Sequence, residues 1–404
     1  MEFQISAKAK KVIFGLVGVG LALFFIGIFL DDSDQSKTRI FSNLLINGLF
    51  FLFISLGALF FLALQYATET GWSVAIKRVV EGVASYVLLG GAIVVAIFLV
   101  LTFTDGGYTE IHGHHLGHIY QYFDSEIVNH DKIIANKAPF LTKGFFWGAT
   151  VVYMAIYYMF YLGFRKRSLR EDIEGGTKIH FKNFAKAAFF LVLFGYTSST
   201  LTWHWLMSID PHWFSTLYGW YVFSGMWLTA MVSIMLLVLY LKSLGHLQVV
   251  NNSHIHDIGK WIFALSFLWS YLFFSQFMLY WYANIGEEVI YYRFRFDNYK
   301  YIFWGMFAIN FIIPMLILMS REAKRNIGIL VTVCFIIILG HWADMFMLVT
   351  PGSMGEYGHI GLVEIGLFLF FAGVFAYWVL NTLTKAPLVP KNHPYLDESK
   401  HHDI

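Results

Sequence analysis

LLINGLFFLFISLGALFFLAL, residues 44–64, is an apolar run without a single charged side chain. About 20 such residues in a helix cross a bilayer core of about 30 Å. Runs of this kind recur along the chain, and they decide its fold class. We count ten, approximately at residues 11–30, 44–64, 83–104, 141–163, 185–208, 216–241, 258–281, 300–320, 327–349 and 360–383.

The composition supports the same interpretation. The 404 residues are 58% hydrophobic and only 13% charged, with a mean hydropathy of +0.60. Soluble domains are about a quarter charged. The first span is too long for the apolar region of a signal peptide, so we expect it to be a retained helix. The sequence predicts an all-α integral membrane protein with a transmembrane domain at 1–384 and a polar tail at 385–404.

The distribution of basic residues predicts the orientation. If the N-terminus is cytoplasmic and the spans alternate, 20 of the 28 Lys and Arg residues fall on the cytoplasmic side and 8 on the outer side. This bias agrees with the positive-inside rule, so we expect both termini in the cytoplasm. The basic run from Arg165 to Lys186 lies next to two spans, which makes anionic lipid headgroups its expected partner. The net charge of +2 gives no indication of nucleic-acid binding.

The chain has few residues that could hold a redox centre. Cys334 is the one cysteine, so iron–sulfur clusters and covalent c-type haem are excluded. A b-type haem needs two buried axial ligands, and only His204 and His341 lie inside the predicted spans. We expect no cofactor on this chain, so haem and iron–sulfur clusters of any electron-transfer assembly belong to partner subunits.

A histidine-rich segment, HGHHLGH at residues 112–118, lies in the longest predicted outer loop. His112, His114, His115 and His118 raise a metal hypothesis, and His114 and His118 share one face if the segment is helical. No carboxylate or thiolate stands at an obvious completing position. We therefore assign no metal ligands to the chain and favour packing of this loop against a partner.

WHWLMSIDPHWFSTLYGWYVFSG, residues 203–225, joins two spans through a very short turn that contains ionisable groups. Ionisable side chains within a membrane are costly and usually functional. Similar groups occur near the outer ends of other spans. His341 and Asp344 share one side of a helix, and Glu287 and Glu288 close the seventh span, where Gln276, Tyr280 and Asn284 recur at helical spacing. The candidates for proton transfer are His204, Asp210, His212, Glu287, Glu288, His341, Asp344 and Glu364.

Each of these groups also has a purely structural explanation, as a helix cap or an interhelical hydrogen bond. For His212, Glu287 and Glu288, which lie near the interface, that explanation is at least as good as function. For His341, Asp344 and Glu364, which lie deeper, we favour function. Most Trp and Tyr residues nearby fit an interfacial aromatic belt.

Three segments resemble one known family. MSIDPHWFSTLYGWYVFSG (207–225), FSQFMLYWYANIGEE (274–288) and GHWADMFMLVTP (340–351) resemble the ActF-type membrane subunit of bacterial alternative complex III. That complex is a quinol:electron-acceptor oxidoreductase, and the subunit belongs to the NrfD/PsrC-like group. The resemblance extends over essentially the whole chain. One departure is Gly286, where the family pattern YANIPEE has proline.

The resemblance implies two four-helix bundles, helices 2–5 and 6–9, with helices 1 and 10 outside them. It also implies the bacterial inner membrane and a set of partners: a sister NrfD-like quinol-binding subunit, a multihaem cytochrome c and iron–sulfur subunits. The substrate of such a complex is menaquinol or ubiquinol. The candidates for a quinol pocket on this chain are His204, Asp210, Tyr280, His341 and Asp344.

Two other functions remain open at this point. A proton-coupled secondary transporter would place polar residues on broken helices near the midplane, and Pro314 is the only clear mid-span proline. A purely structural scaffold subunit would tolerate neutral replacement of every deep ionisable group. Copurification distinguishes these functions, because a transporter purifies alone and a complex subunit brings haem- and cluster-bearing partners.

Overall fold

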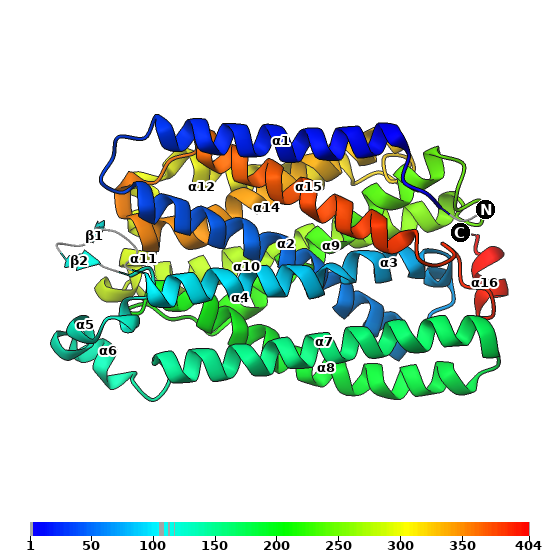
Figure 1. Ribbon diagram of the computed structural model, residues 1–404, viewed down its shortest axis with the longest axis horizontal. Coiled ribbons are helices and arrows are strands. Elements are labelled where there is room, and N and C mark those ends of the chain that lie inside the picture. The colour runs from blue at the N-terminus through cyan, green and yellow to red at the C-terminus, as the bar shows by residue number, and fades with distance from the viewer. Residues whose placement is uncertain (1–2, 105–108, 112–113, 117, 404) are drawn as a thin grey trace.

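The computed structural model describes residues 3–104, 109–111, 114–116 and 118–403, and these residues are mostly helical (Figure 1). Among them, ten helical segments are long and apolar enough to cross a membrane, as the sequence predicted. In chain order their elements are α1 (Ala7–Phe29), α2 (Ser36–Ala67), η1 (Trp72–Ile76) with α3 (Lys77–Ala84) and α4 (Tyr86–Phe103), α7 (Lys143–Glu174), α8 (Lys178–Trp205), α9 (Leu217–Ser243), α10 (Asn252–Ala283), α12 (Lys300–Phe307) with η4 (Ala308–Ile312) and α13 (Ile313–Ile317), α14 (Ile327–Met354) and α15 (Leu362–Leu383).

Shorter elements lie at the two ends of this helical body. We call the end that carries α5, α6 and α11 the outer end, and the end that carries α16 and the start of α1 the inner end (Figure 1). The short elements are β1 (Thr109–Ile111), β2 (His114–Leu116), η2 (Gln121–Phe123), α5 (Ser125–His130), α6 (Lys132–Asn136), η3 (Met207–Ile209), α11 (Gly286–Asn298), η5 (Gly355–Tyr357) and α16 (Leu396–Lys400). The strands β1 and β2 form one antiparallel hairpin, with Glu110 opposite His115.

The long helices form two rings of four. In the first bundle, α2 packs against α4, α4 against α7, α7 against α8, and α8 against α2. In the second, α9 packs against α10, α10 against η4 and α13, α12 against α14, and α14 against α9. Helices α1 and α15 pair with each other outside both rings, and α15 also contacts α2. This arrangement confirms the predicted pair of four-helix bundles with the first and last helices outside them.

Helix α2, which contains the run at residues 44–64, connects the two bundles. It contacts α9 and α14 of the second bundle in addition to its own neighbours, and it is the most buried of the ten spans. The apolar run at residues 44–64 therefore lies at the centre of the helical body.

Small residues let α1 and α15 approach closely. A Cβ atom added at Gly20 would lie 2.5 Å from the backbone nitrogen of Phe370, and one at Gly366 would lie 2.6 Å from that of Phe24. Lipid tails are as apolar as the helix surfaces, so the hydrophobic effect contributes little to helix association in a membrane. Close van der Waals packing of this kind drives it instead. These two glycines fix the pair formed by α1 and α15.

The eighth span contains a wide turn. Residues 308–312 form the π-helix η4, and Pro314 follows in α13. Proline lacks an N–H group and its ring clashes with the carbonyl four residues earlier, here that of Asn310. The wider turn accommodates the proline, and such π-turns are frequent at functional sites.

Candidate functional site

The centre of the candidate site is the buried pair His341 and Asp344 on α14. Both side chains are less than a tenth exposed, and His341 Nδ1 lies 3.8 Å from Asp344 Oδ2. The two residues share one face of the helix, as their spacing predicted. The separation is too long for a direct hydrogen bond, yet it keeps an imidazole and a carboxylate side by side in the middle of the second bundle.

Asp344 receives its hydrogen bonds from two other helices of this bundle. The Tyr221 hydroxyl on α9 donates to Oδ1, and the Trp269 indole on α10 donates to Oδ2 at 3.2 Å. Within the described part of the chain, no Lys or Arg forms an ion pair with this carboxylate. A buried ionisable group inside a membrane span, held by neutral donors and by no fixed cation, is a candidate for a functional role.

More buried polar groups lie near this pair without a partner among the described residues. They are His341 Nε2, both side-chain polar atoms of Asn310 on η4, and the Ser266 hydroxyl on α10. A Cβ at Gly340 would lie 2.1 Å from Asn310 Oδ1, so glycine is what allows Asn310 to reach α14. A cavity of about 20 Å³ also borders His341 and Asp344, which is space for one water. Sequence reasoning did not select Asn310, Tyr221, Trp269 or Ser266, and Pro314 was the only signal that pointed toward η4.

An open cavity of about 920 Å³ at the outer end is lined by the turn at residues 210–213, by α11 and by the segment around α5. We call it the outer vestibule. In its wall, Arg295 Nη2 lies 3.1 Å from Asp210 Oδ2. The same guanidinium donates from Nε to the carbonyl oxygen of Met347, one turn beyond Asp344, at 3.2 Å. Arg295 therefore connects the vestibule to the helix that carries the buried pair.

Arg295 is fixed from several sides. Its guanidinium lies 3.4 Å above the ring of Tyr291, and Trp213 stacks on the same ring at 3.8 Å. Burial acts to lower the pKa of Arg295, but Tyr291 and Asp210 raise it above its ordinary value, so the guanidinium stays charged. Asp210 therefore faces a permanent cation, in contrast to Asp344.

A line of aromatic side chains leads from the vestibule to Asp344. The ring centroids of Trp213 and Tyr218 lie 5.9 Å apart, and those of Tyr218 and Tyr221 lie 6.4 Å apart. Tyr221 ends the line at the Asp344 carboxylate. The structure thus brings the predicted Asp210, His341 and Asp344 into one region of the second bundle.

His204 does not join this region. It lies on α8 in the first bundle, where its ring stacks on Phe140 at 4.1 Å. Its Nδ1 lies 3.0 Å from the Thr200 carbonyl oxygen and 3.1 Å from the Tyr153 hydroxyl. The two span histidines, His204 and His341, therefore face different surroundings and border no common cavity in the described part of the chain.

The remaining candidates near the interface have local roles. His212 is half-exposed, and its Nε2 lies 2.5 Å from Asp131 Oδ2, which fastens the turn at residues 210–213 to the start of α6. Tyr280 donates its hydroxyl to the carbonyl of Phe214 across the same turn. Both contacts shape the wall of the vestibule.

Glu287 and Glu288 do not close the seventh span, and that prediction was wrong. Asn284 ends α10 in the left-handed conformation, with φ of 49°, and the two glutamates occupy the first turn of the separate helix α11. Carboxylates are favoured there by the helix dipole. Glu287 is exposed and lines the vestibule. Gly286 is the first residue of α11, a position that also suits the proline of the family pattern.

Glu364 is held in a complete set of hydrogen bonds at the start of α15. Its carboxylate accepts from Arg39 Nε at 2.8 Å and from Arg39 Nη2 at 2.6 Å. It also accepts from the Asn43 amide and the Gly361 backbone N–H, each at 2.8 Å. A carboxylate paired in this way joins α2 to α15, and removing it would leave Arg39 buried without its main partner, which favours a structural role for Glu364.

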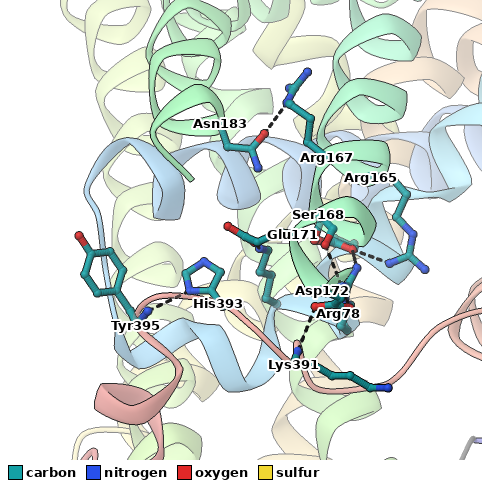
Figure 2. Close-up of polar contacts among 12 residues, drawn as sticks. Arg78, Arg165, Arg167, Ser168, Glu171, Asp172, Asn183, Lys391, His393 and Tyr395 are labelled. Atoms are coloured by element: carbon teal, nitrogen blue, oxygen red, sulfur yellow. Dashed lines mark hydrogen bonds and ion pairs between the residues drawn. The ribbon is translucent and has the colours of Figure 1, made fainter. Parts of the chain in front are cut away.

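The largest polar cluster lies at the inner end, and sequence reasoning missed it. Arg78 Nη1 lies 2.9 Å from Glu81 Oε2, and Arg78 also pairs with Asp172. Arg165 pairs with the same Glu81, and Lys77 Nζ lies 3.0 Å from Glu171 Oε2. Figure 2 shows Arg78, Arg165, Glu171 and Asp172 gathered where α7 meets the C-terminal tail. Two sequence signals point to this cluster: the spacing of Arg78 and Glu81, and two acidic residues inside a basic loop. From the sequence alone, these residues look like charges that flank the spans.

The histidine-rich segment falls partly outside the described residues, because His112 lies among those that the structure does not describe. His114 and His115 belong to β2, so the helical pairing of His114 with His118 does not occur.

Comparisons with known proteins add no identification. No protein-family model matches the chain, and no curated protein matches it.

Proposed function

We propose that this chain is a membrane subunit of a bacterial quinol:electron-acceptor oxidoreductase of the alternative complex III type. In this proposal the chain is ActF-like, carries no redox centre of its own, and transfers protons through the cluster around Asp344. The observation that carries the proposal is the buried, cation-free Asp344, which shares its site with His341 and Tyr221 and lies at the end of an aromatic line from the outer vestibule.

The three segments with family resemblance support it, because they meet in space. Tyr221 of segment 207–225 donates to Asp344 of segment 340–351. Gln276 of segment 274–288 accepts a hydrogen bond from Ser215 of the first segment at 3.2 Å. Residues that are far apart in the chain therefore build one region, as expected of a functional site.

The chemistry of quinol oxidation fits this region. Each quinol releases two electrons and two protons, and the protons need acceptors within hydrogen-bond reach and a way out. In this proposal Asp344 and His341 relay protons that are released at the quinol site of the sister subunit, and the outer vestibule is the way out. The electrons pass to haem and iron–sulfur centres of partner subunits.

The quinol itself, menaquinol or ubiquinol, is assigned in this proposal to the sister NrfD-like subunit. The five residues expected to form a pocket here do not line one cavity, since His204 lies in the first bundle and Tyr280 contacts the turn above it. The vestibule, at about 920 Å³, is within the size range of ligand sites and is the place on this chain where a quinol headgroup would fit.

The proposed location is the bacterial inner membrane, with the inner end in the cytoplasm. The basic run from Arg165 to Lys186 covers the turn between α7 and α8, at the same end as α16 and the start of α1 (Figure 1). Positive charge at this end supports the cytoplasmic assignment, and it offers anionic lipid headgroups a surface.

The test is Asp344→Asn in the purified intact complex, with Asp297→Asn, an exposed carboxylate of α11, as the matched control. We expect quinol-dependent acceptor reduction and proton release to fall at least about tenfold in Asp344→Asn, since loss of a positioned proton carrier typically costs more than that. The control should behave as wild type. Wild-type turnover and proton release in Asp344→Asn, with all subunits present, would refute the proposal.

A further inference from the structure

Three metal-ligating side chains from three separate segments converge at the inner end. Glu171 lies in the last turn of α7, His180 in the first turn of α8, and His393 in the C-terminal tail. One ligand atom from each lies within 4.8 Å of the other two, and all three residues are buried. Figure 2 shows the tail passing alongside α7, so that His393 lies beside Glu171.

Two of the candidate ligand side chains have buried donor atoms without a hydrogen-bond partner in the described part of the chain. These atoms are Glu171 Oε1 and His180 Nδ1, and His180 Nε2 lies 3.5 Å from Glu69 Oε1, too far for a normal hydrogen bond. These two residues are only 1% and 2% exposed. Lys77 holds the other carboxylate oxygen, Oε2, at 3.0 Å, which orients the carboxyl group and leaves Oε1 for a further ligand. Buried polar atoms without partners are uncommon and call for a water or an ion.

A small cavity borders two of the three side chains. A cavity of about 20 Å³ is lined by both His180 and His393, together with Lys77 and Tyr66. That volume holds one water or one ion. The two imidazole rings stand nearly perpendicular, with their centroids 5.2 Å apart, so neither blocks the other.

We propose that Glu171, His180 and His393 form a zinc site that fastens the C-terminal tail to the first bundle. Two imidazoles and one carboxylate are a known ligand set for Zn²⁺, with bonds of about 2.0–2.2 Å and a fourth position left to water. Bonds of that length place tetrahedral ligand atoms about 3.4 Å apart. Because the ligand atoms all lie within 4.8 Å of one another, each pair has to close by at most about 1.4 Å, a movement within the reach of side-chain rotation.

The charges nearby favour Zn²⁺ over hard cations. Lys77, Arg78 and Arg165 are each paired with an acidic group, so the inner cluster has no large excess of negative charge to attract Mg²⁺ or Ca²⁺. Imidazole nitrogen suits Zn²⁺ among the common divalent ions.

One existing contact of His393 has to change, and zinc at His180 Nε2 would also displace Glu69, whose Oε1 lies 3.5 Å away. The backbone N–H of Tyr395 donates to His393 Nδ1 at 3.2 Å, a long hydrogen bond. Zinc bound at Nδ1 would replace it, and zinc bound at Nε2 would require the proton to sit on Nδ1. Either way, the site exchanges one weak contact for a metal bond that joins the tail to two helices.

The experiment measures zinc in the full-length protein, purified within its membrane complex without a polyhistidine tag. After chelator treatment and equilibration with Zn²⁺, elemental analysis should give about one more zinc per chain in wild type than in His393→Ala. His401→Ala, which changes an exposed histidine of the same tail, should keep the wild-type content. The histidine-rich segment at 112–118 is intact in all three proteins, so any metal bound there cancels.

Limited proteolysis supplies a readout that does not depend on activity. Zn²⁺ should slow cleavage of the tail in wild type and in His401→Ala, and should have no effect in His393→Ala. Equal zinc content in wild type and His393→Ala, or tail cleavage that ignores zinc in wild type, would overturn the proposal. The effect of Zn²⁺ on tail cleavage is measured in the wild-type protein itself. A folding defect in His393→Ala therefore cannot produce a false positive result in that measurement.

Discussion

The ion pair between Glu364 and Arg39 separates a structural role from a proton-carrying one. Glu364 was among the residues that sequence favoured for function, yet the structure gives its carboxylate two bonds from Arg39 and further bonds from Asn43 and Gly361. The perturbation is Glu364→Gln, which keeps the size of the side chain but removes its charge. If Glu364 carried protons, this change would lower turnover and leave stability intact.

The structure predicts the opposite result. Removing one member of a buried ion pair typically costs about 3–5 kcal/mol, because the other charge stays buried and unpaired. Arg39 keeps a second partner, Asp31, at 3.1 Å, which places the expected loss near the lower end, about 3 kcal/mol. The glutamine amide also points a donor at the guanidinium, so it cannot replace both bonds. The pair joins α2 to α15, and the loss should appear as easier separation of α1 and α15 from the bundles.

The assay combines denaturant unfolding of the detergent-solubilised complex with quinol-dependent turnover. We expect Glu364→Gln to unfold at clearly lower denaturant concentration, with turnover per folded complex close to wild type. Asp31→Asn is the control, since Arg39 then keeps its two-point contact with Glu364, and its loss should be smaller. Unchanged stability with strongly reduced turnover in Glu364→Gln would refute the structural assignment and restore Glu364 to the proton route.

Three further predictions follow from single contacts. Tyr221→Phe removes a hydrogen-bond donor of Asp344, so quinol-dependent turnover should fall severalfold with an unchanged set of subunits, and wild-type turnover would contradict this. Gly340→Ala places a methyl group against the buried amide of η4 and should lower the unfolding free energy by about 1–3 kcal/mol, measured with denaturant in detergent. Burial acts to raise the pKa of Asp131, but hydrogen bonds from His212 and the backbone lower it overall. The contact is therefore complete above about pH 4 and is lost as the pH falls through the lowered pKa, and proteolysis of the α5–α6 segment should accelerate only in that acid range.

The sequence was sufficient for the membrane architecture, and the reason is physical. A span must satisfy its backbone hydrogen bonds internally and expose apolar side chains to lipid. Each spanning helix therefore corresponds to one continuous apolar stretch of the sequence. The run at residues 44–64 shows this well, although α2 extends beyond it at both ends, from Ser36 to Ala67. The pairing of helices into two bundles came from the family resemblance, because hydropathy contains no information on which spans touch.

The site was predicted only in part. Spacing alone put His341 and Asp344 on one face, because helical geometry is local. The partners of Asp344 come from other helices, and Tyr221 looked like one more residue of the interfacial belt. Likewise, Arg78 and Lys77 looked like flanking charges until tertiary structure buried them beside Glu81 and Glu171. Contacts between distant segments leave no mark in a single sequence.

The contrast between paired and unpaired charges now narrows the candidates for proton transfer. At the helix ends, Glu364 and Asp210 face Arg39 and Arg295, so each of these carboxylates has a permanent cation as its partner. In the middle of the second bundle, Asp344 has only neutral donors and an imidazole beside it, with Asn310 unsatisfied nearby. A carboxylate whose neutralisation would leave a buried arginine unpaired is better suited to a structural contact than to carrying protons. The same residue type therefore has opposite roles in this chain, and the neighbouring cation decides which.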